Sequence, residues 1–277
     1  MKLILYNKFK KLVLRPLHKK MSHKLSCRLE NAIAFIRGKN IKFIYDGGMF
    51  ACEDGLKQKI SNKLRGFKLY RNGITFREKE LFDSYCLGKI NFDKNDIVFD
   101  CGANSGDLFL RLNRLIVAQN YYAFEPNPED YKVLDYNVKN RGGRTYNLAL
   151  GDSDSQLVFF TATSKGDSSI IEPISWDEKT IVNVVRLDTF LAESNINKVK
   201  LLKLEAEGYE PEILSGIGNM LCVFEYIAID GGFERGKNKD ETFTTCTNYL
   251  LSNGFEVIDI YFKSHRALYR RCCVTDA

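Results

Sequence analysis

The stretch from Ile97 to Leu112, "IVFDCGANSGDLFLRL", joins a short apolar run to an acid, a turn with two glycines and an amphipathic segment. The apolar run predicts a buried strand that ends at Asp100. Gly102 and Gly106 then predict a tight turn, because glycine adopts positive φ without strain. This pattern fits a turn that only connects a strand to a helix, and it also fits a turn that binds a ligand. The rest of the sequence is needed to distinguish the two.

From residue 76 onward, apolar runs of strand length alternate with amphipathic segments of helical length. The predicted strands cover 96–102, 121–128, 144–151, 155–163, 198–208 and 222–230, and the predicted helices cover 75–88, 107–119, 129–141, 210–221 and 240–254. Residues 184–194 are predicted to pass from a strand into a helix. This alternation predicts an α/β fold, a doubly wound and mostly parallel sheet covered on both faces by helices. Two final strands, at 255–262 and 265–272, predict an antiparallel strand at one edge.

Residues 1–75 lack this alternation, and residues 39–75 combine several glycines with short strand-like pieces such as "IKFIY" and "FKLY"; the glycines are Gly47, Gly48, Gly55, Gly66 and Gly73. We therefore expect a separate helical and irregular N-terminal region before a domain at 76–277. Ser22 can cap a helix that Gly38 ends. The first 24 residues contain seven lysines and one arginine, and no apolar run reaches the roughly 18 residues that span a bilayer. They predict either a basic segment lying on an anionic membrane surface or an ordinary helix with a solvated lysine face.

The amino-acid composition is that of a globular protein and gives no indication of a metal site or of a nucleic-acid partner. The chain has 277 residues, of which 44% are hydrophobic and 27% charged, as in soluble globular proteins. The net charge of +6 is too mild to demand nucleic acid as a partner. Eight cysteines without a C-x-x-C pair and three scattered histidines predict no metal site and indicate free thiols in a reducing, cytoplasmic compartment.

Polar side chains recur where the predicted strands end, at Asp100, Glu125, Asn147 and Glu205. In open α/β sheets ligands bind beyond these carboxyl ends. The turn lacks both G-x-G-x-x-G and G-K-[ST], the patterns of dinucleotide and phosphate loops. Acids before the turn and at Asp107 suit a cationic or zwitterionic ligand better than a bare pyrophosphate. Glu125 can accept hydrogen bonds from both hydroxyls of a ribose.

Five segments carry a family resemblance: "VFDCGANSGD", "AFEPNP", "NLALGD", "VVRLDTFL" and "LLKLEAEGYEPEILSG". In this order and spacing they resemble the FkbM-type S-adenosylmethionine-dependent methyltransferases, over roughly residues 76–260. The part from Lys203 to Gly208 is the most specific to that family. The resemblance implies a class I methyltransferase fold, a Rossmann-like seven-stranded sheet with an antiparallel edge strand, and S-adenosylmethionine as the cofactor.

The resemblance also implies roles for individual residues. Those implied to bind the cofactor are Asp100, Gly102, Asn104, Gly106, Glu125, Asn127, Asn147, Ala149 and Asp152, with the last three near the adenine. Those implied to act in catalysis are Lys203, Glu205 and Glu207. The family usually has aspartate where this chain has Glu205.

A carboxylate at the end of the strand can take the proton that a hydroxyl acceptor loses. Glu205 and Glu207 point to opposite sides as long as the strand stays extended, so one of them is expected to face the ligand. The alternative is that Glu207 caps the following helix or pairs with Lys203. Glu234 and Arg235, in "DGGFERG", are candidates to recognise a polar acceptor or are part of a solvated loop.

The function that the resemblance implies is methyl transfer from S-adenosylmethionine to a hydroxyl of a small or saccharide acceptor, in polysaccharide, glycolipid or secondary-metabolite biosynthesis. A nucleic-acid methyltransferase is an alternative, but the chain has "LEAEGYEP" where enzymes that methylate bases have a motif like N-P-P-[YF]. A non-catalytic subunit that binds the cofactor is another alternative. An NAD-dependent oxidoreductase is the remaining one, and the spacing of the glycines in the turn disfavours it. We expect no nucleic acid partner and no metal.

Overall fold

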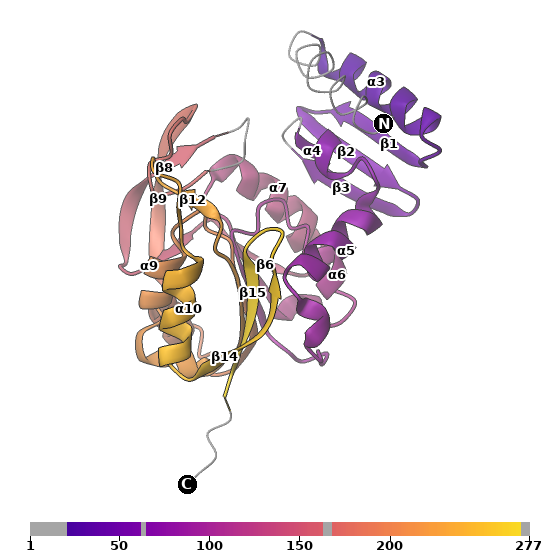
Figure 1. Cartoon of the computed structure of the whole chain (residues 1–277). Helices are drawn as coiled ribbons and strands as arrows, with labels where there is room; N and C mark the ends of the chain where they lie inside the picture. Colours follow the sequence, from indigo (N-terminus) through magenta and orange to yellow (C-terminus); the bar gives the residue numbers. More distant parts are fainter. Residues whose placement is uncertain (1–20, 62–64, 163–167, 273–277) are drawn as a thin grey trace. The chain divides into compact units, whose positions relative to one another are not determined.

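The structure is a computed structural model that describes residues 21–61, 65–162 and 168–272. The chain divides into two compact units, Met1–Arg77 and Glu78–Ala277. The division falls within helix α5 (Ile74–Ser84), shown in purple in Figure 1. The basic segment that begins the chain lies, up to residue 20, outside the described residues.

The first unit contains a three-stranded antiparallel sheet, which corrects the expectation of a helical and irregular region. The strands are β1 (Ile41–Asp46), β2 (Met49–Asp54) and β3 (Lys57–Ser61), and they lie in that order. The glycines that suggested irregular structure form the hairpin turns: Gly47, Gly48 and Gly55 all have positive φ. Two-residue hairpin loops require this conformation, so the glycines mark strand ends.

Two helices cover one face of this small sheet. Helix α3 (His23–Ile36) begins after Ser22, whose side chain accepts a hydrogen bond from the Leu25 backbone, so the predicted helix and cap are confirmed. The Asn31 side chain bonds the backbone N–H and carbonyl of Phe43 on β1, at 2.6 and 2.9 Å. In α4 (Arg65–Leu69), the Phe67 ring packs edge-on against the rings of Phe43 and Phe50.

The second unit is built on a seven-stranded sheet with the order β14-β15-β11-β10-β4-β5-β6. Its strands are β4 (Val98–Cys101), β5 (Tyr121–Phe124), β6 (Arg144–Tyr146), β10 (Val199–Leu204), β11 (Phe224–Asp230), β14 (Phe255–Tyr261) and β15 (Arg266–Arg271). Strand β15 runs antiparallel to both of its neighbours, and the pairs from β11 across to β6 are parallel. The predicted fold class, a mostly parallel α/β sheet with an antiparallel strand at its edge region, is confirmed.

Helices cover both faces of this sheet because neighbouring residues of each strand face opposite layers. Phe99 packs with α8 (Leu187–Glu193), α9 (Glu210–Ser215) and α10 (Phe243–Ser252). Val98 packs with α5, α6 (Phe109–Leu112) and α7 (Pro128–Val138) on the other face. Buried strands with two apolar faces explain why their sequences are almost continuously apolar.

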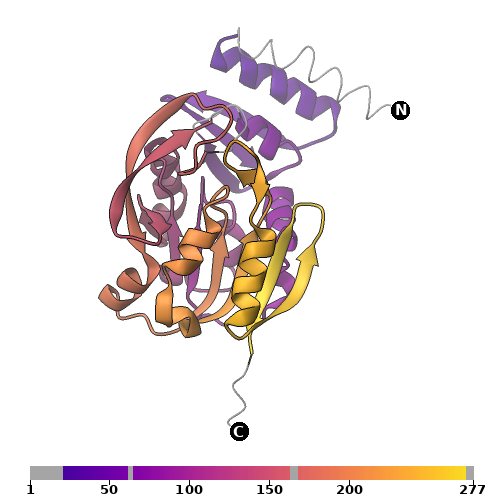
Figure 2. The same ribbon diagram turned by 60° about the vertical axis from the view of Figure 1, so that its left-hand side comes forward.

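A smaller sheet adjoins the main one, with the order β7-β9-β8. Its strands are β7 (Ala149–Gly151), β8 (Ser155–Thr161) and β9 (Glu178–Arg186), and Figure 2 shows β8 and β9 side by side. The single strand predicted at 144–151 is therefore two strands in two sheets. A short pair, β12 (Phe233–Arg235) and β13 (Asp240–Glu241), follows β11. None of the helices in the described ranges is long and apolar enough to cross a membrane.

Candidate functional site

An ion pair between Lys203 and Asp100 lies at the centre of the sheet's carboxyl edge. The parallel register of β10 and β4 places these residues opposite each other, and Lys203 Nζ lies 2.9 Å from Asp100 Oδ1. The Tyr121 hydroxyl donates a hydrogen bond to the other carboxylate oxygen of Asp100. Burial disfavours the ammonium charge, but Asp100 and Glu205 outweigh it and raise the pKa of Lys203 above its ordinary value. The lysine is therefore charged in the folded protein.

Lys203 also holds the glycine turn in place. Its Nζ donates to the backbone carbonyl oxygens of Cys101 and Gly102, at 3.0 and 2.9 Å. Gly102 has a φ of +68°, and a Cβ atom there would lie 1.9 Å from the carbonyl oxygen of Glu205. Only glycine permits this close approach, so the turn after β4 rests directly on the end of β10. With its side chain 2% exposed, Lys203 is a positioning residue.

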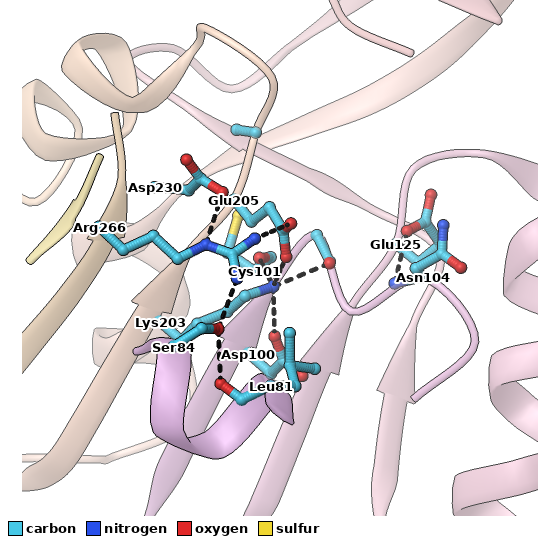
Figure 3. Close-up of polar contacts among 12 residues, drawn as sticks. Leu81, Ser84, Asp100, Cys101, Asn104, Glu125, Lys203, Glu205, Asp230 and Arg266 are labelled. Atoms are coloured by element: carbon cyan, nitrogen blue, oxygen red, sulfur yellow. Dashed lines mark hydrogen bonds and ion pairs between the residues drawn. The ribbon is translucent and has the colours of Figure 1, made fainter. Parts of the chain in front are cut away.

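Glu205 lies between two cations, as Figure 3 shows. Its Oε2 is 3.1 Å from Lys203 Nζ, and its Oε1 is 3.1 Å from Arg266 Nη2. Burial opposes ionisation, but these two cations hold the pKa of Glu205 well below its usual range. A carboxylate so stabilised is a weak proton acceptor. The geometry favours Glu205 as a fixed anion rather than the general base that the sequence suggested.

Arg266, the first residue of β15, is a site residue that the sequence analysis missed. Its Nε donates to Asp230 Oδ2 at 2.7 Å and its Nη1 to Ser84 Oγ at 2.6 Å. The guanidinium carbon lies 4.3 Å from the centroid of the Tyr85 ring, within reach of a cation–π interaction. The available signal was the position of this arginine near the start of a predicted strand, since a charged side chain that becomes buried in a sheet needs partners.

Glu125 joins the turn after β4 to the loop after β5. Its Oε2 accepts the backbone N–H of Asn104, and its Oε1 accepts that of Asn127, both at 2.9 Å. Asn104 has a φ of +48°, which points its N–H toward this carboxylate. The Asn147 side chain donates to the carbonyls of Glu125 and Pro126 at 2.9 and 3.0 Å. The Asn104–Glu125 pair lies beside the Lys203 network in Figure 3.

Asn127 serves as the N-cap of α7. Its side-chain oxygen accepts the backbone N–H of Glu129 and Asp130 at 2.9 and 3.1 Å, and its amide group donates to Thr161 Oγ1 at 2.9 Å. The loop conformation around Glu125 is thus fixed by the start of a helix. A direct contact between Asn127 and the cofactor stays a prediction.

The segment expected near an adenine is divided between two places. Asn147 lies against Glu125, whereas Ala149 is buried in β7. Asp152 follows β7 and is exposed, and its backbone carbonyl accepts a hydrogen bond from Arg186 at 2.7 Å. A Cβ atom on Gly216 would lie 3.2 Å from the Asp152 Cα, so this residue adjoins the end of α9.

The chain turns sharply after β10, so the strand does not continue through Glu205 and Glu207. Glu207 and Gly208 have φ values of +51° and +100°. Glu210, buried at the start of α9, accepts the backbone N–H of Ala206 at 2.7 Å and of Gly208 at 3.3 Å. Glu210 is therefore the residue that fixes this turn. The Glu207 side chain does not take that role.

Glu207 acts instead on Glu234, on β12, where its side chain lowers the pKa of the Glu234 carboxyl. Burial, and then the negative charge of Asp230, raise the pKa of Glu234 to about 7. A carboxyl group of this kind changes protonation near neutral pH. It stands just beyond β11, at the carboxyl edge of the sheet.

The guanidinium group of Arg235, the residue after Glu234, is bound by other groups of the protein. It forms a two-point ion pair with Glu212, at 2.6 and 2.9 Å, and donates to the Gly208 carbonyl. It therefore clamps the turn after β10 instead of facing an acceptor. Across the described part of the chain, no group of three His, Cys, Asp or Glu side chains is arranged to hold a metal ion.

Sequence comparisons with known proteins find methyltransferases. The family model described as the methyltransferase FkbM domain matches residues 100–257. "Methyltransferase 1" of Beauveria bassiana is 26% identical over 219 residues, 69% of this chain and 86% of that protein. The hexuronic acid methyltransferase AglP of Haloferax volcanii is 23% identical over 138 residues, 50% of this chain and 56% of that protein.

Among solved structures, magnesium protoporphyrin IX methyltransferase (ChlM) from Synechocystis PCC 6803, with bound SAM, aligns with a TM-score of 0.42 and 10% identity. The alignment covers 74% of this chain and 83% of that one. The family match extends over more than half of the chain and includes Asp100, Glu125, Lys203 and Glu234. The chain belongs to the FkbM methyltransferase family.

Proposed function

We propose that the protein transfers a methyl group from S-adenosylmethionine to a hydroxyl oxygen of a saccharide or other small acceptor. The family supports methyl transfer as the reaction. The observation that carries the choice of a hydroxyl acceptor is the position of Glu234 on β12, just after β11 at the edge of the sheet where ligands of α/β proteins bind. Burial raises the pKa of this carboxyl group to about 7, which suits it to accept a proton.

The charges at the sheet edge suit this cofactor. Three carboxylates, those of Asp100, Glu205 and Asp230, lie around the two cations Lys203 and Arg266, so the cluster has a net negative charge. S-adenosylmethionine carries a positive sulfur and an ammonium group, whose charges such a cluster stabilises. The cofactor supplies a methyl group already activated by the positive sulfur that holds it.

Two parts of the chain are suited to hold the cofactor. The turn from Gly102 to Gly106 is fixed by Lys203 on one side and by Glu125 on the other, so it is preorganised for the amino acid end. Glu125 is 6% exposed and held by two backbone N–H groups, a suitable acceptor for ribose hydroxyls.

The chain's own contribution to the reaction is alignment and proton removal. A hydroxyl acceptor must lose its proton as the new C–O bond forms. Glu234 is suited to take it, because a general base works best when its pKa is close to the working pH. Glu205, paired with Lys203 and Arg266, stays anionic and keeps the edge of the sheet rigid.

A saccharide is the favoured acceptor class because a relative with this domain, AglP, is a hexuronic acid methyltransferase by name. The proposal extends to a role in the biosynthesis of a polysaccharide, a glycolipid or a secondary metabolite. The identity between the two chains is 23%, so the sugar itself is to be found by experiment.

The test is methyl transfer from radiolabelled S-adenosylmethionine to a panel of hexoses, uronic acids, glycolipids and RNA. We expect label in a hydroxyl-bearing saccharide, with the new O-methyl group located by NMR. Glu234→Gln should lower turnover at neutral pH by about 10²-fold or more while cofactor binding persists. Label in RNA or on a nitrogen would contradict the proposal, and cofactor binding without transfer to any acceptor would indicate a non-catalytic subunit.

A further inference from the structure

The two units of the chain differ sharply in charge. Residues 1–77 contain 19 of the 41 lysines and arginines but 4 of the 35 acidic residues, whereas residues 78–277 contain 22 and 31. The first unit is therefore strongly basic and the second acidic. Such asymmetry between parts of one chain indicates that the basic part meets an anionic partner.

Large apolar side chains are exposed on the same basic unit. Phe35 and Ile36, the last two residues of α3, are 84% and 82% exposed, and Leu56, in the β2–β3 turn, is fully exposed. The backbone from Phe35 to Asn40 presents six exposed residues in a row. Isolated exposed apolar residues are common on protein surfaces, so their grouping matters more than their number.

The strand register brings these side chains to one end of the unit. Helix α3 leads directly into β1, and Ile41, the first residue of β1, is paired with Asp54, the last residue of β2. The turn that carries Leu56 follows Asp54 at once. The end of α3 and the β2–β3 turn therefore lie at the same end of the small sheet.

Cationic side chains surround this end. Arg37 and Lys39 directly follow Ile36, and Lys57 directly follows Leu56. The Arg37 guanidinium hydrogen-bonds the Arg71 carbonyl and the Asn72 side chain, which brings a further arginine to the same end. We define the apical cluster as Phe35, Ile36, Arg37, Lys39, Leu56 and Lys57.

We propose that the apical cluster docks on the surface of an anionic lipid bilayer. Apolar side chains next to lysine and arginine are suited to an interface where the former enter the headgroup layer and the latter attract lipid phosphates. A nucleic acid would attract the cations but would leave Ile36 and Leu56 without a favourable contact. This inference is independent of the proposed methyl acceptor.

The test is co-sedimentation of the full chain with vesicles of phosphatidylcholine alone or mixed with phosphatidylglycerol. We expect binding to the mixed vesicles that falls as salt rises. The double variant Phe35→Ser/Ile36→Ser should bind at least about tenfold more weakly, since it removes two apolar side chains. Lys39→Glu should weaken binding about fivefold or more, because it replaces a positive charge near the surface by a negative one.

The matched control is Phe262→Ser, which removes an aromatic side chain that is 80% exposed on the second unit and is followed by Lys263. It should bind vesicles as the wild type does, and all variants should keep the wild-type melting temperature. The proposal is overturned if the full chain does not bind the vesicles that contain phosphatidylglycerol, or if it binds vesicles of phosphatidylcholine alone equally well. Equal losses in the control and the double variant, or tighter binding to RNA than to vesicles at the same salt, would also overturn it.

Discussion

Lys203 is the residue on which the arrangement of the site depends, because its ammonium group contacts two carboxylates and the glycine turn. The sequence marked it as specific to the family, and its position in a buried strand already implied that it has partners. What the sequence could not supply was the identity of those partners. Asp100 is about one hundred residues away and becomes a neighbour through the pairing of β4 with β10.

We predict that Lys203→Met destabilises the protein by about 3–5 kcal/mol, because it leaves buried carboxylates without their cation. The measurement is the free energy of unfolding from urea titration. Lys132→Met is the control, since Lys132 also pairs with a carboxylate, that of Glu129, but is exposed. It should leave the unfolding midpoint nearly unchanged. Equal effects of the two substitutions would contradict a central role for Lys203.

Glu234 gives a prediction about pH. Its pKa of about 7 predicts that kcat/KM rises with pH up to that value and then levels off, because the base must be deprotonated. Glu234→Gln should remove this dependence. The same group binds a proton more tightly in the folded than in the unfolded protein, so it lowers stability as pH rises from about 4.5 to 7.

A second measurement on this variant does not need a known acceptor. Relative to the wild type, Glu234→Gln should gain melting temperature between pH 5 and pH 8, since the variant no longer loses a stabilising proton. A difference between the two proteins that is constant over this range would show that Glu234 does not titrate there.

At the scale of elements, the approach of the β4 turn to the end of β10 can be tested at Gly102. We predict that Gly102→Ala destabilises the protein strongly, because the added Cβ would overlap the Glu205 carbonyl oxygen. The control is Gly254→Ala, in the same unit, where φ is +79° and nothing lies within 4 Å of the added atom. The control carries the strain of positive φ alone, about 1–2 kcal/mol.

The comparison is made by thermal unfolding of the two variants and by their binding of S-adenosylhomocysteine. Gly102→Ala should lose binding, and Gly254→Ala should retain it. Similar stability and binding in both variants would mean that the close approach is not needed for the site.

The sequence predicted correctly those helices and strands whose signals lie within the segment itself. Strands β4, β5, β10 and β11 are apolar runs with polar ends, and α7 has its cap and acidic first turn in the sequence. In the first unit the sequence indicated the strand-like piece "IKFIY", which is β1, but not the sheet, because glycines that form hairpin turns also occur in irregular loops. Arg266 was missed because no local pattern shows which strand lies beside β11.

At the scale of the whole molecule, the net charge of the chain did not reveal that its two units carry charges of opposite sign. The net charge of +6 was too mild to demand nucleic acid as a partner, yet it is the sum of a basic unit and an acidic one. The fold class, in contrast, could be predicted from the sequence, because the alternation of strands and helices extends over the whole second unit.

The central claim is that the carboxyl edge of the main sheet binds S-adenosylmethionine through Glu125 and the glycine turn. Isothermal titration of the full chain with S-adenosylhomocysteine tests it most directly, with NADH as the competing ligand class and Glu129→Ala as a control at an exposed acid. We predict that the wild type and the control bind S-adenosylhomocysteine and not NADH, and that Glu125→Ala binds at least about tenfold more weakly. Binding of NADH alone, or unchanged affinity in Glu125→Ala, would contradict the claim.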